Sequence, residues 1–187
     1  GIVLGIGVGW MREGFEALGS PPFEERGAVS DEYIRAIKEL WTSSNPTFEG
    51  KYCRFSDITF LPKPLQKPHP PIWIGGESPR AIRRAAELGD AWHPVGAHPR
   101  HPYGELHQLD AAIKLLAHHA DKAGRDPGQI EVAFRTHAYK LRKGNTGPAS
   151  LTGKRRTFEG TAEEIASDIR AFENIGVTQL VMHFIQA

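Results

Sequence analysis

Apolar runs with strand character alternate along the chain with segments whose apolar positions recur at helical spacing. The runs predict five buried strands, near residues 2–8, 71–75, 90–95, 130–140 and 178–184. The helical spacing predicts helices over residues 30–41, 78–88, 103–123 and 161–175. Strands that alternate with helices are typical of a parallel sheet with crossover helices, so the fold class is α/β.

Two architectures fit this alternation. One is a doubly wound open sheet, and the other is a (β/α)8 TIM barrel that lacks its first three strands in this chain. Both place ligands at the carboxyl ends of the strands. The chain opens directly in a strand-like run, GIVLGIGVGW, without methionine, so we interpret it as a piece whose amino-terminal part is missing. We expect residues 1–187 to form a single domain, with an inserted hairpin at about residues 46–61.

Composition narrows the function classes. The 187 residues are 40% hydrophobic and 24% charged with a net charge of +1, which argues against a nucleic-acid partner. No apolar run is long enough to cross a membrane, and the single cysteine fits a cytoplasmic protein. The nine histidines show no zinc-site spacing, so we expect no metal. The basic run Lys154-Arg155-Arg156 is interpreted as a solvated loop, with a phosphate contact as the alternative, and residues 142–156 are the best candidate for a mobile lid.

The stretch IWIGGESP joins a predicted strand to a predicted helix through Gly75 and Gly76. Glycine lets a ligand approach the backbone closely, Ser78 suits the N-cap, and Pro79 suits the first helical position. The free N–H groups at the start of the helix would then face an anion. A phosphate site is one interpretation, and a tight capped turn without a ligand is the other. Glu77 counts against the phosphate unless its side chain points away.

A second glycine cluster, Gly5, Gly7 and Gly9, precedes Trp10. Its spacing does not match the dinucleotide-binding fingerprint. Alternating glycines leave one strand face bare, which suits either a flat ring lying on that face or close packing against a neighbouring element.

His93 ends the predicted strand AWHP, where chemistry is expected in this architecture. A hydrogen-bonded packing role is the alternative. Arg135 and His137 share one strand face and, with Tyr139, could line a pocket or form a wet exterior edge. The sequence contains no nucleophile elbow and no evident carboxylate pair, and a site with glycines, aromatics and few acids suits a bound cofactor that carries the chemistry.

Several blocks together resemble the luciferase-like monooxygenase superfamily, and most closely its members described as oxidoreductases that use the deazaflavin coenzyme F420. These blocks are LGIGVGWMREGFEALG, FEERGAVSDEYIRAIKELWT, FEGKYCRFSDITFLPKPLQKPHPPIWIGGESPRAIRRAAELGDAWHP and GTAEEIASDIRAFENIGVTQLVMHF. The resemblance covers nearly the whole chain. It implies a (β/α)8 barrel of which this chain supplies strands four to eight, a flavin or deazaflavin at the carboxyl-terminal mouth, and a homodimer.

Carried over by position, the resemblance implies two groups of cofactor-binding residues. Gly7, Val8, Gly9 and Trp10 would border the cofactor ring, and Gly75, Gly76 and Ser78 would hold its phosphate end. His93 is our candidate proton donor. Two hypotheses follow: a redox enzyme that uses F420, or alternatively FMN in a monooxygenase, on a small-molecule substrate; or a non-catalytic or truncated relative that only binds a cofactor. The sugar-phosphate dehydrogenase branch carries an acid where this chain has Trp10, so its chemistry is not expected.

Overall fold

The computed structural model describes residues 1–187 except 97, 104, 137–138, 143–154 and 183–187. The chain divides into two compact units, Gly1–Gly75 and Gly76–Ala187, which are described in turn. Whether the whole chain is one domain stays a prediction. In the described part of the chain, no helix is long and apolar enough to cross a membrane.

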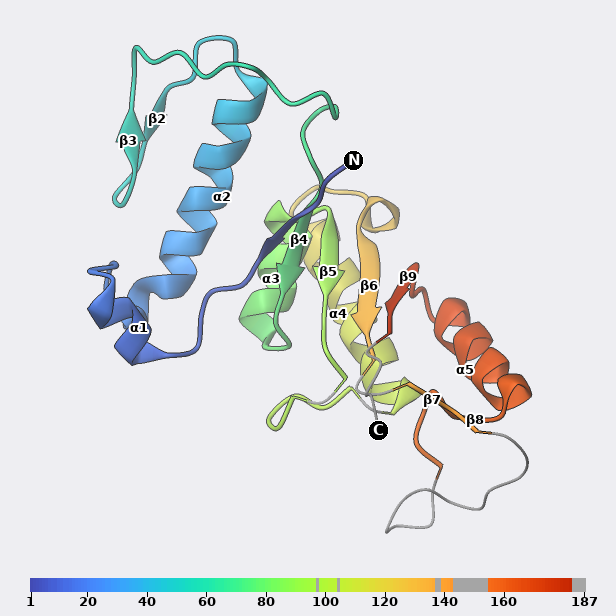
Figure 1. The fold of residues 1–187 in the computed structure, drawn as a ribbon. Helices are drawn as coiled ribbons and strands as arrows, with labels where there is room; N and C mark the ends of the chain where they lie inside the picture. Colours follow the sequence, from blue (N-terminus) through green and yellow to red (C-terminus); the bar gives the residue numbers. More distant parts are fainter. Residues whose placement is uncertain (97, 104, 137–138, 143–154, 183–187) are drawn as a thin grey trace. The chain divides into compact units, whose positions relative to one another are not determined.

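The first unit pairs two parallel strands and carries a long helix with a small hairpin beside it (Figure 1). Its elements are β1 (Leu4–Ile6), α1 (Arg12–Ala17), the 3-10 turn η1 (Phe23–Glu25), α2 (Arg26–Thr42), β2 (Phe48–Glu49), β3 (Arg54–Phe55) and β4 (Ile72–Gly75). Strands β1 and β4 run parallel, with Leu4 opposite Ile72 and Ile6 opposite Ile74. The strands β2 and β3 form the predicted antiparallel hairpin, in which Phe48 stacks on Phe55.

A single carboxylate ties the hairpin turn to α2. Glu32 accepts hydrogen bonds from the backbone N–H groups of Lys51 (3.0 Å), Tyr52 (2.6 Å) and Cys53 (2.7 Å). Burial alone would raise the pKa of Glu32, but these three hydrogen bonds stabilise the charged form, and the net effect is a lowered pKa. The hairpin is therefore held to α2 by an ionised side chain.

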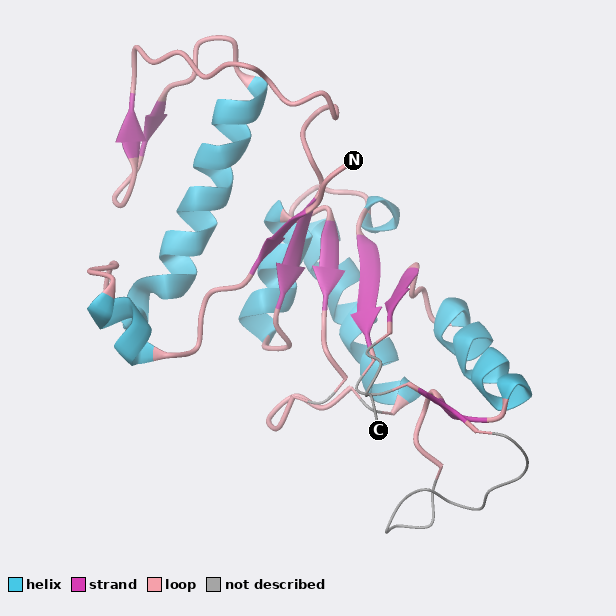
Figure 2. Ribbon diagram, viewed as in Figure 1, coloured by secondary structure: helices cyan, strands magenta, loops and turns pink. Residues whose placement is uncertain are grey.

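The second unit is built on three parallel strands, which Figure 2 shows in magenta. Its elements are α3 (Pro79–Leu88), β5 (Ala91–His93), α4 (Leu106–Lys122), the 3-10 turn η2 (Pro127–Gln129), β6 (Glu131–Arg135), β7 (Lys140–Leu141), β8 (Glu159–Gly160), α5 (Ala162–Asn174) and β9 (Gln179–Val181). Strand β6 pairs in parallel with β5 on one side and with β9 on the other. Helices α3 and α4 cover the same face of these strands (Figure 1).

The core of the second unit explains why its local sequence folds in this way. Helix α3 turns its alanines inward, so that it can lie close to α4 and β5. Fully or nearly fully buried apolar side chains fill the space between helices and strands: Ala81, Ile82, Ala85, Trp92, Leu109, Leu116, Val132 and Phe134. The capping box predicted for α5 is present, with Thr161 and Glu164 bonding each other's backbone N–H groups.

All five predicted strands are found, as β1, β4, β5, β6 and β9, but several element boundaries differ, and those of α2 and β6 differ most. Helix α2 begins at Arg26 rather than at residue 30, because the 3-10 turn η1 already leads into it, and the Ser30 hydroxyl donates to the Arg26 carbonyl instead of capping. The strand predicted over 130–140 ends at Arg135, and Lys140–Leu141 pairs separately with β8. Most of the predicted lid, residues 143–154, lies outside the described residues.

Candidate functional site

The turn from β4 into α3 has the local chemistry that its sequence predicted. Strand β4 ends at Gly75, Ser78 is the N-cap of α3, and Pro79 is its first residue. The Ser78 hydroxyl accepts a hydrogen bond from the Ala81 N–H at 3.2 Å, which satisfies one of the unpaired donors of the first helical turn. The start of α3 is thus fixed by its own sequence.

Gly76 is required by the backbone itself. Its φ of +114° lies in a region that side-chain-bearing residues rarely adopt, and a Cβ at this position would lie 3.0 Å from the Cβ of Ala81. A glycine here therefore has a structural reason that is independent of any ligand. This distinguishes Gly76 from a glycine that is kept only to leave room for a cofactor.

Two buried aromatic side chains hold the carbonyl groups of this turn. The indole N–H of Trp92, in β5, donates to the Gly76 carbonyl at 2.9 Å. The hydroxyl of Tyr103 donates to the Glu77 carbonyl at 2.8 Å. The two rings also meet edge to face, with centroids 5.6 Å apart, so the turn rests on one aromatic pair.

The side chain of Glu77 is buried and is used within the protein. Its Oε1 accepts a hydrogen bond from the backbone N–H of Val95 at 2.9 Å, just beyond β5. Burial, followed by the nearby charge of Glu77, raises the pKa of the Tyr103 hydroxyl, which therefore stays protonated as a donor. The acidic residue that counted against an anion at this turn is thus engaged with the loop after β5.

The turn keeps backbone donors available for a ligand. Among the described residues, the N–H groups of Glu77, Ser78 and Arg80 make no hydrogen bond. They lie at the start of a ten-residue helix, where the helix dipole favours negative charge. Arg80 adds an exposed positive side chain in the first turn of this helix. The chemistry of this donor set fits the phosphate end of a cofactor.

The loop after β1 carries the other predicted cofactor residues, Gly7, Val8, Gly9 and Trp10. Since Ile6 stands opposite Ile74, the register brings Gly7 and Gly75 to the same edge of two adjacent parallel strands. Within the first unit these two glycines are therefore brought together. The loop then enters α1, whose N-cap Met11 makes no side-chain capping bond.

The glycines of this first loop have different surroundings. Among the residues that the structure describes, a Cβ added to Gly5 or Gly7 would meet nothing within 4 Å. Gly9, by contrast, has a φ of +83°, and a Cβ there would lie 2.6 Å from the ring of Phe15. Trp10 is 85% exposed. The ring site predicted along β1 and Trp10 therefore stays a prediction.

His93, the candidate proton donor, ends β5 and is partly buried. Its Nδ1 lies 2.6 Å from the carbonyl oxygen of Ala133 in the neighbouring strand β6. Because a carbonyl only accepts, Nδ1 carries the hydrogen, and any proton exchanged with a ligand would pass through Nε2. The contact also agrees with the alternative of a hydrogen-bonded packing histidine.

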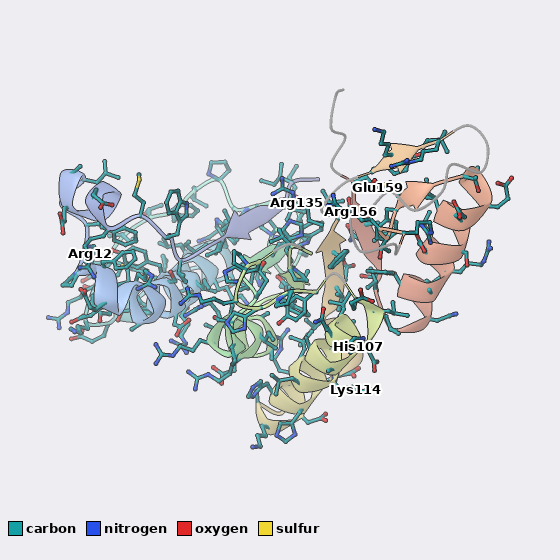
Figure 3. The ribbon with its side chains drawn as sticks, turned by 90° about the horizontal axis from the view of Figure 1, so that it is seen from below. Arg12, His107, Lys114, Arg135, Arg156 and Glu159 are labelled. Atoms are coloured by element: carbon teal, nitrogen blue, oxygen red, sulfur yellow. The ribbon has the colours of Figure 1, made fainter. Side chains whose placement is uncertain are left out.

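The described part of the basic run, Arg155 and Arg156, is exposed and lies outside helices and strands, as predicted for a solvated loop, and both arginines also make ion pairs. Arg155 makes two hydrogen bonds to Asp168, at 2.7 and 2.5 Å, and this carboxylate raises the pKa of the arginine. Arg156 lies 3.9 Å from the buried Glu159, and Figure 3 shows the two side by side. Lys154 is outside the described residues. The arginines therefore serve ion pairs near the start of α5.

Of the predicted pocket residues on β6, Arg135 can be placed in the structure. Arg135 is exposed at the end of β6, and its backbone bonds Pro94 and Gly96, while His137 lies outside the described residues. Within the described ranges, no three histidine, cysteine, aspartate or glutamate side chains are grouped to hold a metal ion.

Comparison with protein-family models assigns the chain to a family. The family model of luciferase-like monooxygenases matches residues 1–143. The chain belongs to the luciferase-like monooxygenase family.

Relatives of this luciferase-like chain use two kinds of cofactor according to their names. An FMNH(2)-dependent dimethylsulfone monooxygenase of Pseudomonas putida is 45% identical over 94 residues, which are 49% of this chain and 26% of that protein. An F420-dependent glucose-6-phosphate dehydrogenase of Amycolatopsis mediterranei (strain U-32) is 28% identical over 195 residues, covering 100% of this chain and 56% of that protein. The chain thus spans about a quarter of the first relative's length and just over half of the second's.

Solved structures confirm the fold. An F420-dependent secondary alcohol dehydrogenase, solved with an F420-acetone adduct, superposes with a TM-score of 0.73 at 19% identity, over 97% of this chain and 63% of that one. A coenzyme F420-dependent tetrahydromethanopterin reductase from Methanopyrus kandleri gives 0.71 at 15% identity, over 96% of this chain and 67% of that one. The fold is therefore that of a luciferase-like α/β barrel, represented here in part.

The luciferase-like turn contains functional candidates that sequence reasoning missed. Trp92 and Tyr103 lie 16 and 26 residues beyond the carbonyls that they bind. No local sequence pattern predicts these two hydrogen bonds. They form only because the folded chain brings β5 and the loop after it next to the β4–α3 turn. The only hint in the sequence was Trp92, a tryptophan in a predicted buried strand that follows the Gly75-Gly76 turn.

Proposed function

We propose that the protein is an oxidoreductase that binds coenzyme F420 and takes part in hydride transfer between it and a small organic substrate. The observation that carries the proposal is the β4–α3 turn, where Glu77, Ser78 and Arg80 offer backbone N–H groups to an anion at a helix start. Family membership supports it, since relatives named for F420 and for FMNH(2) are both found. When bound, the deazaflavin would supply the ring carbon that accepts or delivers hydride.

In this proposal, different residues of the chain would contact the phosphate end and the ring of the cofactor. Gly76 and Ser78 shape the turn that holds the phosphate end, with Gly75 at the strand end before it. Gly7 and Val8 would border the ring along the bare face of β1, and Gly9 and Trp10 would complete that loop. The exposed indole of Trp10 stands where the sugar-phosphate branch carries an acid, so we expect a substrate other than a sugar phosphate.

His93 is proposed as the group that gives or takes one proton. Its Nδ1 hydrogen bond to the Ala133 carbonyl fixes the ring, so that Nε2 is the atom that would act. A His93→Gln variant should then lose turnover while keeping cofactor affinity. Equal loss of turnover and of cofactor binding would indicate a packing role instead.

A second candidate is an FMN-dependent monooxygenase. The 45% identity with the dimethylsulfone monooxygenase of Pseudomonas putida is the observation that favours it. FMN and F420 both carry a phosphate and a tricyclic ring, so the same turn would serve either. The two candidates differ in which cofactor binds, and this can be measured directly.

The test is a fluorescence titration of the full chain with four compounds: F420, its phosphate-free deazaflavin, FMN and riboflavin. We expect F420 to bind about tenfold or more tightly than its phosphate-free form, since one or two charge-assisted hydrogen bonds are at stake. Inorganic phosphate should compete with F420 and leave the phosphate-free compound unaffected. Tight binding of FMN alone would move the protein to the monooxygenase candidate. Binding of none of the four would overturn the redox function and favour a non-catalytic relative.

A further inference from the structure

The carbonyl groups of the β4–α3 turn are held from one side by buried donors. Trp92 donates to the Gly76 carbonyl and Tyr103 donates to the Glu77 carbonyl. Trp92 is 0% exposed and Tyr103 is 8% exposed. These are two consecutive carbonyls of the chain, so two neighbouring peptide groups are fixed by two separate side chains.

Peptide planarity converts this into a statement about the opposite side of the turn. In a trans peptide group the C=O and the following N–H point in opposite directions. The carbonyl of Gly76 shares its plane with the N–H of Glu77, and the carbonyl of Glu77 shares its plane with the N–H of Ser78. Because both carbonyls point to buried aromatic donors, both N–H groups point away from those donors. These are two of the N–H groups that make no hydrogen bond among the described residues.

Further contacts keep the two planes from rotating. The positive φ of Gly76 sets how the 76–77 plane turns away from the end of β4. Glu77 joins the two planes, and its side chain is anchored by the N–H of Val95 at 2.9 Å. Tyr103 is itself tied to the loop, since its backbone N–H donates to the Gly96 carbonyl at 3.3 Å. The hydroxyl of Tyr103 stays protonated, because burial and the charge of Glu77 raise its pKa.

We propose that Trp92 and Tyr103 are positioning residues of the anion site, which act through the peptide planes 76–77 and 77–78 to aim the Glu77 and Ser78 N–H groups at the phosphate. The inference rests on the proposed function, because it takes the phosphate end of F420 or FMN as the ligand of this turn. By this inference, β5 and the loop after it belong to the cofactor site, although their side chains act on the phosphate only through the backbone of the turn.

A purely structural role makes a different prediction. If the two donors only satisfy buried carbonyls, their loss lowers stability and weakens all ligands alike. If they orient the N–H groups, their loss weakens phosphate-bearing ligands alone. The discriminating quantity is therefore the ratio of affinities for a cofactor with and without its phosphate.

The experiment compares the wild type with Tyr103→Phe in the full chain, using F420 against its phosphate-free deazaflavin and FMN against riboflavin. Tyr33→Phe, at a 40% exposed tyrosine of α2, is the matched control for loss of one hydroxyl. We expect Tyr103→Phe to lower the phosphate preference about two- to tenfold, with unchanged affinity for the phosphate-free compounds and with the control at wild-type values. Trp92→Phe should act in the same direction, and Tyr103→Phe carries the test if the tryptophan variant fails to fold.

Two results would overturn the positioning role. One is an unchanged phosphate preference in folded Tyr103→Phe, and the other is an equal loss of affinity for phosphate-bearing and phosphate-free compounds. A wild type that binds both forms of a cofactor equally would instead overturn the phosphate site on which the inference rests. The wild-type ratio therefore separates failure of the proposed function from failure of this inference.

Discussion

Two glycine-containing turns in this chain follow parallel strands, and they are organised in opposite ways. The β4–α3 turn has a capped helix start, a buried acid and two aromatic donors on its carbonyls. The loop after β1 leads into a six-residue helix with no buried residue and no side-chain cap. Its Trp10 is 85% exposed. Similar glycine content thus accompanies one turn that is held by buried hydrogen bonds and one that leads into an uncapped helix without buried residues.

The difference bears on how a cofactor would be held. A preorganised donor set loses little entropy on binding an anion, so we expect affinity to come chiefly from the β4–α3 turn. The open loop would instead be ordered by the ring that it borders. Substitutions in the β4–α3 turn should therefore affect both folding and phosphate affinity, whereas substitutions in the loop after β1 should leave stability nearly unchanged. The following experiments test this contrast.

The largest effect is expected from adding a methyl group to each turn. Gly76→Ala would place a side chain at φ +114°, 3.0 Å from the Ala81 Cβ, and should lower the free energy of unfolding by about 2–3 kcal/mol. Gly7→Ala is the matched control, since a Cβ there meets nothing within 4 Å, and it should change stability by less than about 0.5 kcal/mol. Urea unfolding followed by circular dichroism measures both. Equal effects at the two positions would remove the contrast.

Loss of the buried carboxylate should rank second. Glu77→Leu leaves the Val95 N–H without its acceptor and should destabilise the protein by about 1–3 kcal/mol. Glu77→Gln keeps an acceptor oxygen at the same reach and should fall clearly below the leucine variant. The same unfolding measurement checks the order, and a glutamine variant as unstable as leucine would show that the charge, rather than the hydrogen bond, matters.

The helix starts offer a smaller and opposite pair of effects. Ser78→Ala removes the cap of α3 and should cost about 1 kcal/mol, whereas Ser78→Thr retains it. Met11→Ser would introduce a cap where α1 has none and should make its amides exchange more slowly. Hydrogen exchange of the first helical turns tests both. Faster exchange in α1 after Met11→Ser would contradict the account of the open loop.

These contrasts also mark what the sequence could predict. The Ser78 cap and the Thr161–Glu164 box follow from local rules, and each was predicted and found. The start of α2 was missed, because the 3-10 turn ahead of it has no strong local signature. The partner of Glu77 and the donors to its turn could not be predicted, since they depend on which distant segments meet at the strand ends.

The smallest expected effect is a pH dependence in the hairpin of the first unit. The pKa of Glu32 is lowered below its ordinary value of 4.5, so its anchoring is fully present above that value and is lost as the pH falls through the lower, folded-state pKa. The protection of the residue 51–53 amides against exchange, measured relative to the intrinsic exchange rate at each pH, should therefore fall below about pH 4.5. In Glu32→Gln this acid-induced step should be missing. A wild-type step unchanged by the substitution would assign it to another group.

The central claim is that the β4–α3 turn binds phosphate through backbone N–H groups. The most direct measurement is a titration of the ¹⁵N-labelled chain with F420 and with its phosphate-free deazaflavin, followed by amide NMR. We predict that the amide signals of Glu77, Ser78 and Arg80 shift with F420 and stay in place with the phosphate-free compound, while the signals of Gly7 and Val8 move with both. F420 binding that leaves the Glu77 and Ser78 amides unmoved would contradict the claim.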